Sequence, residues 1–294
     1  MADKATGRKK VTIADRFRHN KAALVALIVL VIMFAAIFGA NFVSPYDPAQ
    51  SSLRGRLVGP SFTPLEEGAT PHYLGTDQLG RDTFSRLLHG GQVSLNVGFT
   101  VATIGAIIGI ILGMFAGYFG GWTDMIIMRL VDIWSSSPTL LIALTFVMIL
   151  GPGQRNLIIA LLINSWTLFC RMARSQVLVM RGSAMVESGQ AIGASTNRIL
   201  FKHIMPNIIS PLVTTYVLEV AHFINAEANL SFLGFGVQPP QTSWGLMIGE
   251  GRKYLTQAPW LVLFPGLMIG VTVLCLNLVG NWIRDEFDPL AVKL

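Results

Sequence analysis

Long apolar segments separated by polar stretches dominate this chain. A helix needs about 20 mainly apolar residues to cross a hydrocarbon layer of about 30 Å. Segments of this order occur at residues 22–43, 93–118, 125–150, 157–172, 208–228 and 261–283. The pattern predicts an all-α membrane protein with six transmembrane helices. The first segment is too long for a signal peptide and lacks a clear cleavage site, so we expect it to remain as the first span.

Composition and charge favour the same class. The chain is 52% hydrophobic and 13% charged, with a mean hydropathy of +0.56, whereas soluble proteins carry about 25% charged residues. The net charge is +6, and residues 1–21 hold seven Lys or Arg against Asp3 and Asp15. A basic tail directly before an apolar span is typical of a cytoplasmic flank. We therefore expect it to orient the chain and expect no nucleic-acid partner.

This orientation divides the chain into regions. The basic tail at 1–21 lies in the cytoplasm, and the first span at 22–43 leads to an extracytoplasmic region at 44–91. The core domain at 92–294 carries the other five spans and a cytoplasmic loop at 184–207. With six spans, the N- and C-termini are both expected in the cytoplasm.

The loop at 184–207 has a periodicity of its own. It contains charged residues such as Glu187 and Arg198, so it is unsuited to crossing a membrane, yet apolar residues recur at helical spacing on either side of Gly193. We predict two short amphipathic helices joined at Gly193, where a residue without Cβ permits a left-handed turn. Pro206 should end the second helix or begin the next span, because proline lacks a backbone donor. A solvated loop between two spans is the alternative.

The fifth predicted span is unusually polar, with Glu219, His222, Asn225 and Glu227 in its second half. Ionisable side chains inside a membrane usually face a bundle interior or a watery path. We hypothesise that Glu219, His222 and Asn225 border a translocation path; the alternative is a polar pair that holds helices together. Glu219 and His222 have the Glu-x-x-His spacing of di-metal bundles. The second such motif and the further carboxylates of those bundles are missing, so we expect no metal.

Other candidate ligands are also interpreted as structural. His72, Asp77 and Asp82 are scattered in the first polar region, where such residues usually are solvated or cap helices, and we expect no metal there. Cys170 and Cys275 lie in apolar segments, which predicts buried thiols rather than a disulfide.

Two spans carry packing signals. A stripe of glycines four residues apart lets another helix approach closely, and we favour packing within this chain over contact with a partner. The stripe consists of Gly105, Gly109, Gly113 and Gly117. In the third span, Arg129 and Asp132 are spaced to pair with each other, and Pro138 after three serines predicts a bend.

Motifs for nucleotide binding and hydrolysis are missing from the sequence. It contains no Gly-x-x-x-x-Gly-Lys-Ser/Thr phosphate loop, no Gly-x-Ser-x-Gly elbow and no His-Glu-x-x-His helix. We therefore expect that the chain is not an enzyme and that any ATP chemistry comes from a partner.

A short motif in the 184–207 loop comprises Glu187, Ser188, Gly189, Gly193, Ile204 and Pro206. It resembles the EAA loop of ABC-importer permeases, with a serine and a glycine where two alanines are usual. The glycine should weaken the helix by about 1 kcal/mol. In that family the loop forms a coupling helix that docks in a cleft of a cytoplasmic ATPase. The resemblance implies that the first four residues shape this helix and that the last two fix where the chain rejoins the membrane.

Further motifs extend the resemblance over nearly the whole chain except the extreme N-terminal tail. They are Asn20-Lys21, PYDP at 45–48, LGTD at 74–77, GRD at 80–82, SRLL at 85–88, GYFGG at 117–121, SFLG at 231–234 and GVQPP at 236–240. Together they are similar to the C-type permease of dipeptide, oligopeptide and nickel ABC importers, which has the type I, MetI-like fold.

This resemblance implies a bacterial cytoplasmic (inner) membrane subunit that is surrounded by lipid. Its expected partners are a second homologous permease, two ABC ATPase subunits and an extracytoplasmic substrate-binding protein. ATP and magnesium would be held by the ATPases, and no cofactor by this chain. The expected substrates are dipeptides or oligopeptides, with nickel complexes, glutathione or another small solute as alternatives.

Two other classes of function are alternatives to a permease subunit. A secondary transporter or channel would use Glu219, His222 and Glu227 for ion or proton coupling without an ATPase. Inverted repeats with broken helices would favour it, and the sequence has no such internal symmetry. An intramembrane enzyme would need a nucleophile or a complete metal set, neither of which is recognisable.

Overall fold

The computed structural model describes residues 20–65 and 70–287 of the chain. The predicted basic tail at 1–21 falls almost entirely outside the described residues, as does the end of the predicted core domain at 92–294. Within the described residues, extended structure is limited to an isolated bridge between Thr76 and Asp82. The prediction of an all-α protein is confirmed.

The chain forms a series of helices of very different lengths. They are α2 (Lys21–Phe38), α3 (Ala40–Val43), α4 (Thr83–Phe119), α5 (Gly121–Ser135), α6 (Thr139–Leu150), α7 (Gln154–Arg181), α8 (Ala184–Ala191), α9 (Thr196–Arg198), α10 (Met205–Phe232), α11 (Trp244–Gly251) and α12 (Trp260–Phe287). Short 3₁₀ turns lie at Leu53–Gly55 and Arg252–Tyr254, and a π-helical turn at Ile199–Ile204 joins α9 to α10.

Five helices of the described chain are long and apolar enough to cross a membrane: α2, α4, α7, the continuous helix Thr196–Phe232, and α12. The pair α5 and α6 makes a sixth span if it is counted as one, although its two halves are bent by 81°. Pro138 immediately precedes α6, so the bend predicted in the third span is confirmed. A proline at this point cannot continue the hydrogen-bond pattern of α5.

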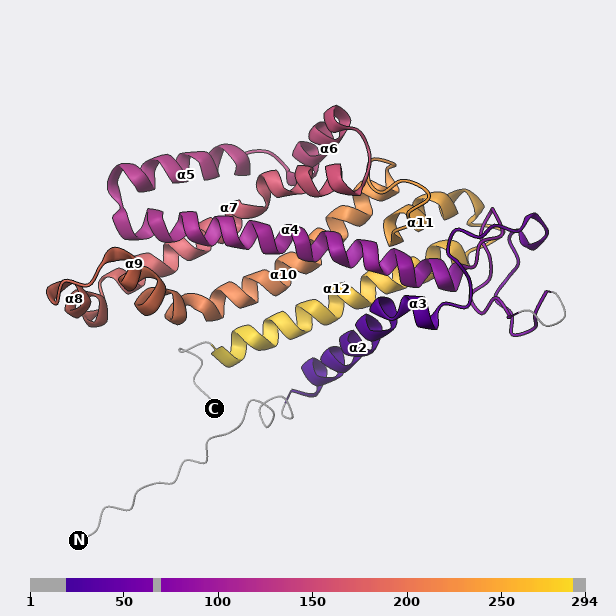
Figure 1. Cartoon of the computed structure of the whole chain (residues 1–294), viewed down its shortest axis with the longest axis horizontal. Coiled ribbons are helices and arrows are strands. Elements are labelled where there is room, and N and C mark those ends of the chain that lie inside the picture. Colours follow the sequence, from indigo (N-terminus) through magenta and orange to yellow (C-terminus); the bar gives the residue numbers. More distant parts are fainter. Residues whose placement is uncertain (1–19, 66–69, 288–294) are drawn as a thin grey trace, which may run out of the picture.

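The long helices lie side by side and give the molecule two distinct ends (Figure 1). At one end are α8 and α9, together with the last residues of α4 and α7. At the other end are α11 and the region between α3 and α4. We refer to these as the α8 end and the α11 end.

The glycine stripe of α4 packs against α7 in the same chain. A Cβ added at Gly105 would lie 2.4 Å from Oγ of Ser165, and one added at Gly109 would lie 2.2 Å from the carbonyl oxygen of Trp166. Gly113 and Gly117 meet the following turns of α7, where an added Cβ would lie 2.3 Å and 2.9 Å from the nearest carbonyl oxygen. The predicted packing within the chain is therefore confirmed, because only glycine allows the two backbones this approach.

The predicted pair between Arg129 and Asp132 is wrong. Asp132 instead accepts a hydrogen bond from Nη2 of Arg171 at 2.9 Å, because α5 lies along α7 and the carboxylate faces that helix. A second arginine of α7, Arg174, forms a two-pronged pair with Asp124 of α5. Cys170 and Cys275 are buried free thiols, as the sequence predicted.

Candidate functional site

The segment that resembles an EAA loop forms a short helix at the α8 end. Helix α8 stops in a left-handed turn at Gly193, where φ is +76°. The amide of Ala194 donates to the carbonyl of Gly189 at 3.0 Å, and the amide of Gly193 donates to the carbonyl of Gln190 at 3.0 Å. This pattern is typical of a glycine-terminated helix. The left-handed turn predicted at Gly193 is confirmed.

One face of α8 is buried, and the other is exposed. Val186 is fully buried in an apolar cluster with Val177 of α7 and with Ile199 and Ile204. Glu187 and Ser188 are exposed. Gly189 is buried, yet a Cβ there would only make an ordinary contact of 3.8 Å with Ile199, so packing alone does not require glycine at this position.

The second short amphipathic helix predicted in this loop is not a separate element. Helix α9 runs through the π-helical turn Ile199–Ile204 into α10, and Thr196–Phe232 forms one continuous helix. Ile204 is fully buried, and Pro206 is the second residue of α10. The π-helical turn includes a bond from the amide of Met205 to the carbonyl of Leu200, and a proline without an amide is tolerated at the start of the following helix.

A polar recess lies between α6, α7 and α10, within the bundle. Its volume is about 160 Å³, and it is lined by Thr139, Asn164, Ser165, Thr167, Leu168, Glu219, His222 and Phe223. Nδ2 of Asn164 donates to Oγ1 of Thr139 at 2.7 Å, and Oγ1 of Thr167 donates to the carbonyl of Asn164 at 2.9 Å. The first bond ties α7 to α6 at the recess, and the second lies within α7.

Of the three residues predicted to border a path, the structure brings two together at this recess. Glu219 and His222 line it, whereas Asn225, one turn further along α10, is half-buried and does not. His222 is exposed on the surface of the isolated chain, and its ring packs edge-on against Phe223 with 5.3 Å between centroids.

Glu227 has a different environment. Its carboxyl is fully buried and accepts hydrogen bonds from Ser94 of α4 at 2.8 Å and from Ser231 at 2.6 Å. Oγ of Ser94 also accepts from the amide of Trp244, the first residue of α11. Glu227 therefore joins α4, α10 and α11 and does not line the recess. A proton-coupled transporter would have used Glu227 together with Glu219 and His222, but Glu227 lies apart from these two residues.

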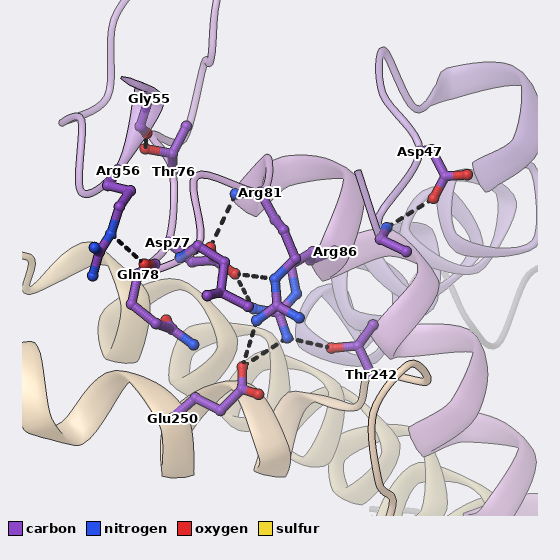
Figure 2. A network of polar contacts seen from close by, with 12 residues as sticks. Asp47, Gly55, Arg56, Thr76, Asp77, Gln78, Arg81, Arg86, Thr242 and Glu250 are labelled. Atoms are coloured by element: carbon purple, nitrogen blue, oxygen red, sulfur yellow. Dashed lines mark hydrogen bonds and ion pairs between the residues drawn. The ribbon is translucent and has the colours of Figure 1, made fainter. Parts of the chain in front are cut away.

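A network of buried charges holds the α11 end together (Figure 2). Arg81 and Arg86 converge on Asp77 and on Glu250 of α11. The bond from Arg81 to Asp77 is 2.6 Å long, and Arg86 donates to Glu250 at 2.8 Å. Two cations thus face two carboxylates, and Arg86 also donates to Thr242. The network connects the start of α4 with α11 and with the turn before α4.

The candidate metal ligands of the first polar region have separate partners. Asp82 caps α4 by accepting from the amide of Ser85 at 2.8 Å, and Nδ1 of His72 lies 2.8 Å from its other oxygen. Asp77 is only 1% exposed and belongs to the network. The interpretation of these residues as capping or solvated groups is correct for Asp82, but it is wrong for Asp77.

Sequence reasoning missed several residues of these sites. Asn164 and Thr139 face Glu219 across the recess, and Glu250 completes the network from more than 160 positions along the chain. No local pattern connects such positions. The sequence did offer one signal of a charge network. Arg81 and Arg86 lie close to Asp77 in a region that was otherwise interpreted as solvated.

Comparisons with known proteins agree with this architecture. A family model described as "Binding-protein-dependent transport system inner membrane component" matches residues 109–293. A second, "N-terminal TM domain of oligopeptide transport permease C", matches residues 12–60. Solved structures of similar fold include an inward-facing MetNI methionine ABC transporter, with a TM-score of 0.56 and 18% identity over 67% of this chain and 93% of that chain. At this identity the likeness concerns the fold.

Curated relatives are much more similar in sequence. The di/tripeptide transport system permease protein DppC of Pseudomonas aeruginosa (strain UCBPP-PA14) is 42% identical over 274 residues, which are 93% of this chain and 89% of the relative. The glutathione transport system permease protein GsiD of Salmonella typhimurium (strain LT2) is 44% identical over 279 residues, 93% of this chain and 88% of the relative. The helical bundle, the α8 segment and these matches together show that the chain belongs to the family of inner-membrane components of binding-protein-dependent transport systems, as a multi-pass permease subunit of an ABC importer.

Proposed function

We propose that this chain forms half of the translocation pathway of a bacterial importer for short peptides. The observation that carries the proposal is the 42% identity, over 93% of the chain, to a permease named for di- and tripeptide transport. The match to an N-terminal domain of oligopeptide transport permeases supports the same substrate class.

In this proposal the chain works in a larger assembly. It pairs with a second, homologous permease, takes substrate from an extracytoplasmic binding protein and is driven by two ABC ATPase subunits. Those ATPases bind ATP and magnesium, and the chain itself hydrolyses nothing and holds no cofactor. The N- and C-termini and the α8 end face the cytoplasm, and the α11 end faces the binding protein.

Helix α8 is the proposed point of coupling. Its exposed Glu187 and Ser188 stand on a helix whose other face is fixed by buried Val186. An ATPase cleft that closes around α8 would transmit its movement through Ile199 and Ile204 to the continuous helix Thr196–Phe232, which carries Glu219 and His222. Gly189 and Gly193 shape the docking helix, and Ile204 and Pro206 set the junction with α10. Glu219, His222 and Asn225 border the path.

Glutathione is the second candidate substrate. GsiD permeases, which are named for glutathione transport, are 40–44% identical to this chain. Glutathione is itself a tripeptide, so a pathway for short peptides and one for glutathione share most of their chemical requirements.

The first experiment is purification of the tagged chain from its native membrane in mild detergent, followed by mass spectrometry of the proteins that accompany it. We expect a second permease and ABC ATPases. Reconstituted with its binding protein, the complex should take up dipeptides only when ATP is supplied. Recovery of this chain alone, with uptake that needs no ATP, would overturn the proposal in favour of a secondary transporter.

A further inference from the structure

The recess between α6, α7 and α10 is rich in hydrogen-bond acceptors and holds one carboxylate. Its polar lining consists of Thr139, Asn164, Ser165, Thr167, Glu219 and His222, and none of the side chains that line it is Lys or Arg. Within residues 20–65 and 70–287, no hydrogen bond or ion pair involves the side chain of Glu219 or His222. A carboxylate inside a membrane is costly unless it meets a partner, so the recess lacks a cation that would balance Glu219.

The nearest arginine on the same face of α7 is already paired. Arg171 lies one turn beyond Leu168, and its guanidinium is bound to Asp132 of α5 at 2.9 Å. Arg174, a further turn away, is held by Asp124. These two arginines of α7 are therefore balanced by carboxylates of α5, which leaves the Glu219 carboxylate open to a cationic ligand.

We propose that this recess binds the N-terminal ammonium group of a transported peptide. An ammonium has three donors and no acceptor, and the recess offers acceptors that include the Glu219 carboxylate, Oδ1 of Asn164 and a ring nitrogen of His222. Nδ2 of Asn164 donates to Thr139 at 2.7 Å, which fixes the amide. Its oxygen accepts one long bond, 3.4 Å, from Oγ1 of Thr167 and keeps a second lone pair for the ligand.

The size and composition of the recess favour an ammonium group over other ligands. The volume of about 160 Å³ is well above what a single water molecule needs, and it is enough for an ammonium with its α-carbon and a small side chain. The rest of the peptide must lie outside the recess, towards the open side on which His222 is exposed. A divalent metal ion would need more oxygen ligands, and the described residues contain no group of three or more His, Cys, Asp or Glu side chains placed to hold one.

The inference rests on the proposed function, because it assigns one subsite to a peptide substrate. It also applies to both candidate substrates, since a dipeptide and glutathione each carry a free α-ammonium group. It adds a recognition step inside the permease to the selection that the binding protein makes.

The test uses the full-length chain in membrane vesicles without ATP. Leu168 lines the recess and is 45% exposed, so Leu168→Cys in a Cys170→Ala, Cys275→Ala background offers one reactive thiol there. We expect L-alanyl-L-alanine to slow alkylation of this cysteine by N-ethylmaleimide, and N-acetyl-L-alanyl-L-alanine to have no effect. Glu219→Gln should raise the dipeptide concentration for half-protection by about tenfold or more, as expected for the loss of a charge-assisted hydrogen bond.

Two controls keep the result interpretable. Without dipeptide, the Glu219→Gln variant should be alkylated as fast as its parent, which shows that the recess is intact. Thr145→Val, on the same short helix α6 but outside the recess, should leave protection unchanged, because its hydroxyl bonds only within α6.

Each alternative result overturns the inference. Equal protection by the acetylated peptide would show that the ammonium is not recognised, and no protection by either peptide would show that the recess does not bind the substrate. Undiminished protection in Glu219→Gln would remove Glu219 as the counter-ion. Any of these results, together with ATP-dependent dipeptide uptake by the intact complex, would leave the proposed function standing.

Discussion

The two ends of this bundle are held together by different forces. At the α11 end, Asp77, Arg81 and Arg86 are buried and bound to one another and to Glu250 by ion pairs that span distant parts of the chain. At the α8 end, α8 is attached to the bundle mainly by apolar contacts around Val186, and its outer face is exposed.

The contrast shows where the fold is fixed and where it can respond. Buried ion pairs tolerate little change in geometry, because a displaced partner leaves an unpaired charge in a medium of low dielectric constant. Apolar contacts are non-directional and can shift without such a penalty. The α11 end is therefore suited to being a rigid frame, and the α8 end to transmitting a movement. Four predictions test this difference, in order of decreasing effect on stability.

The largest effect is expected from breaking the network at its centre. Asp77→Ala leaves Arg81 and Arg86 with Glu250 as their remaining carboxylate partner, and removing one member of a buried ion pair typically costs about 3–5 kcal/mol. The free energy of unfolding in mixed micelles should fall by this order. The matched control is Asp47→Ala in the same region, where the carboxylate is exposed and caps only the amide of Ala49. Equal losses in the two variants would contradict the rigid-frame interpretation.

The second prediction concerns the contact between α4 and α7, the long helices that connect the two ends. Gly109→Ala places a Cβ 2.2 Å from the carbonyl oxygen of Trp166, and such overpacking costs about 1–3 kcal/mol. Gly270→Ala in α12 is the control, since no atom lies within 4 Å of its added Cβ. It should be neutral or stabilising by up to about 1 kcal/mol, because alanine favours helix. Unfolding midpoints of the two variants give the comparison, and a stable Gly109→Ala protein would contradict the close packing of α4 and α7.

The third prediction separates stability from function at the α8 end. Gly193→Arg forces a side chain into a left-handed conformation at a cost of about 1–2 kcal/mol, but an added Cβ meets no atom within 4 Å. The protein should fold and assemble, while ATP hydrolysis no longer drives peptide uptake.

The control for this variant is Gly182→Arg, on the other flank of α8, where φ is −85° and the added Cβ is equally free. It should retain uptake. Hydrolysis and uptake are measured together in proteoliposomes. Normal coupling in Gly193→Arg would argue against α8 as the docking helix.

The smallest effect is expected at the exposed pair between α5 and α7. The side chains of Arg171 and Asp132 are 50% and 59% exposed, and exposed ion pairs contribute about 0–1 kcal/mol. A double-mutant cycle with Arg171→Ala and Asp132→Ala should give a coupling energy in this range. A coupling energy comparable to that of the buried network would show that burial does not explain the difference between the two ends.

Much of the fold was predictable because it depends on local patterns. The apolar segments located the long helices, Pro138 located the bend and Gly193 the left-handed turn, since each of these residues constrains its own backbone. One backbone prediction failed, because the second short helix of the 184–207 loop is continuous with α10. The other failures concerned side-chain partners. Arg129 and Asp132 were paired because they are neighbours on one helix, but the competing partner, Arg171, comes from another.

The candidate sites divide in the same way. The sequence by itself determined the class of protein, the existence of the α8 helix and the unusual polarity of α10, because length, periodicity and residue type are sufficient for these. Only the tertiary structure decided that Glu219 and His222 share a recess with Asn164 while Glu227 is buried with Ser94. It also brought Glu250 to Arg86. The physical reason is that hydrogen bonds and ion pairs act over about 3 Å, so they depend on how helices pack, and the spacing of residues along one helix does not encode that packing.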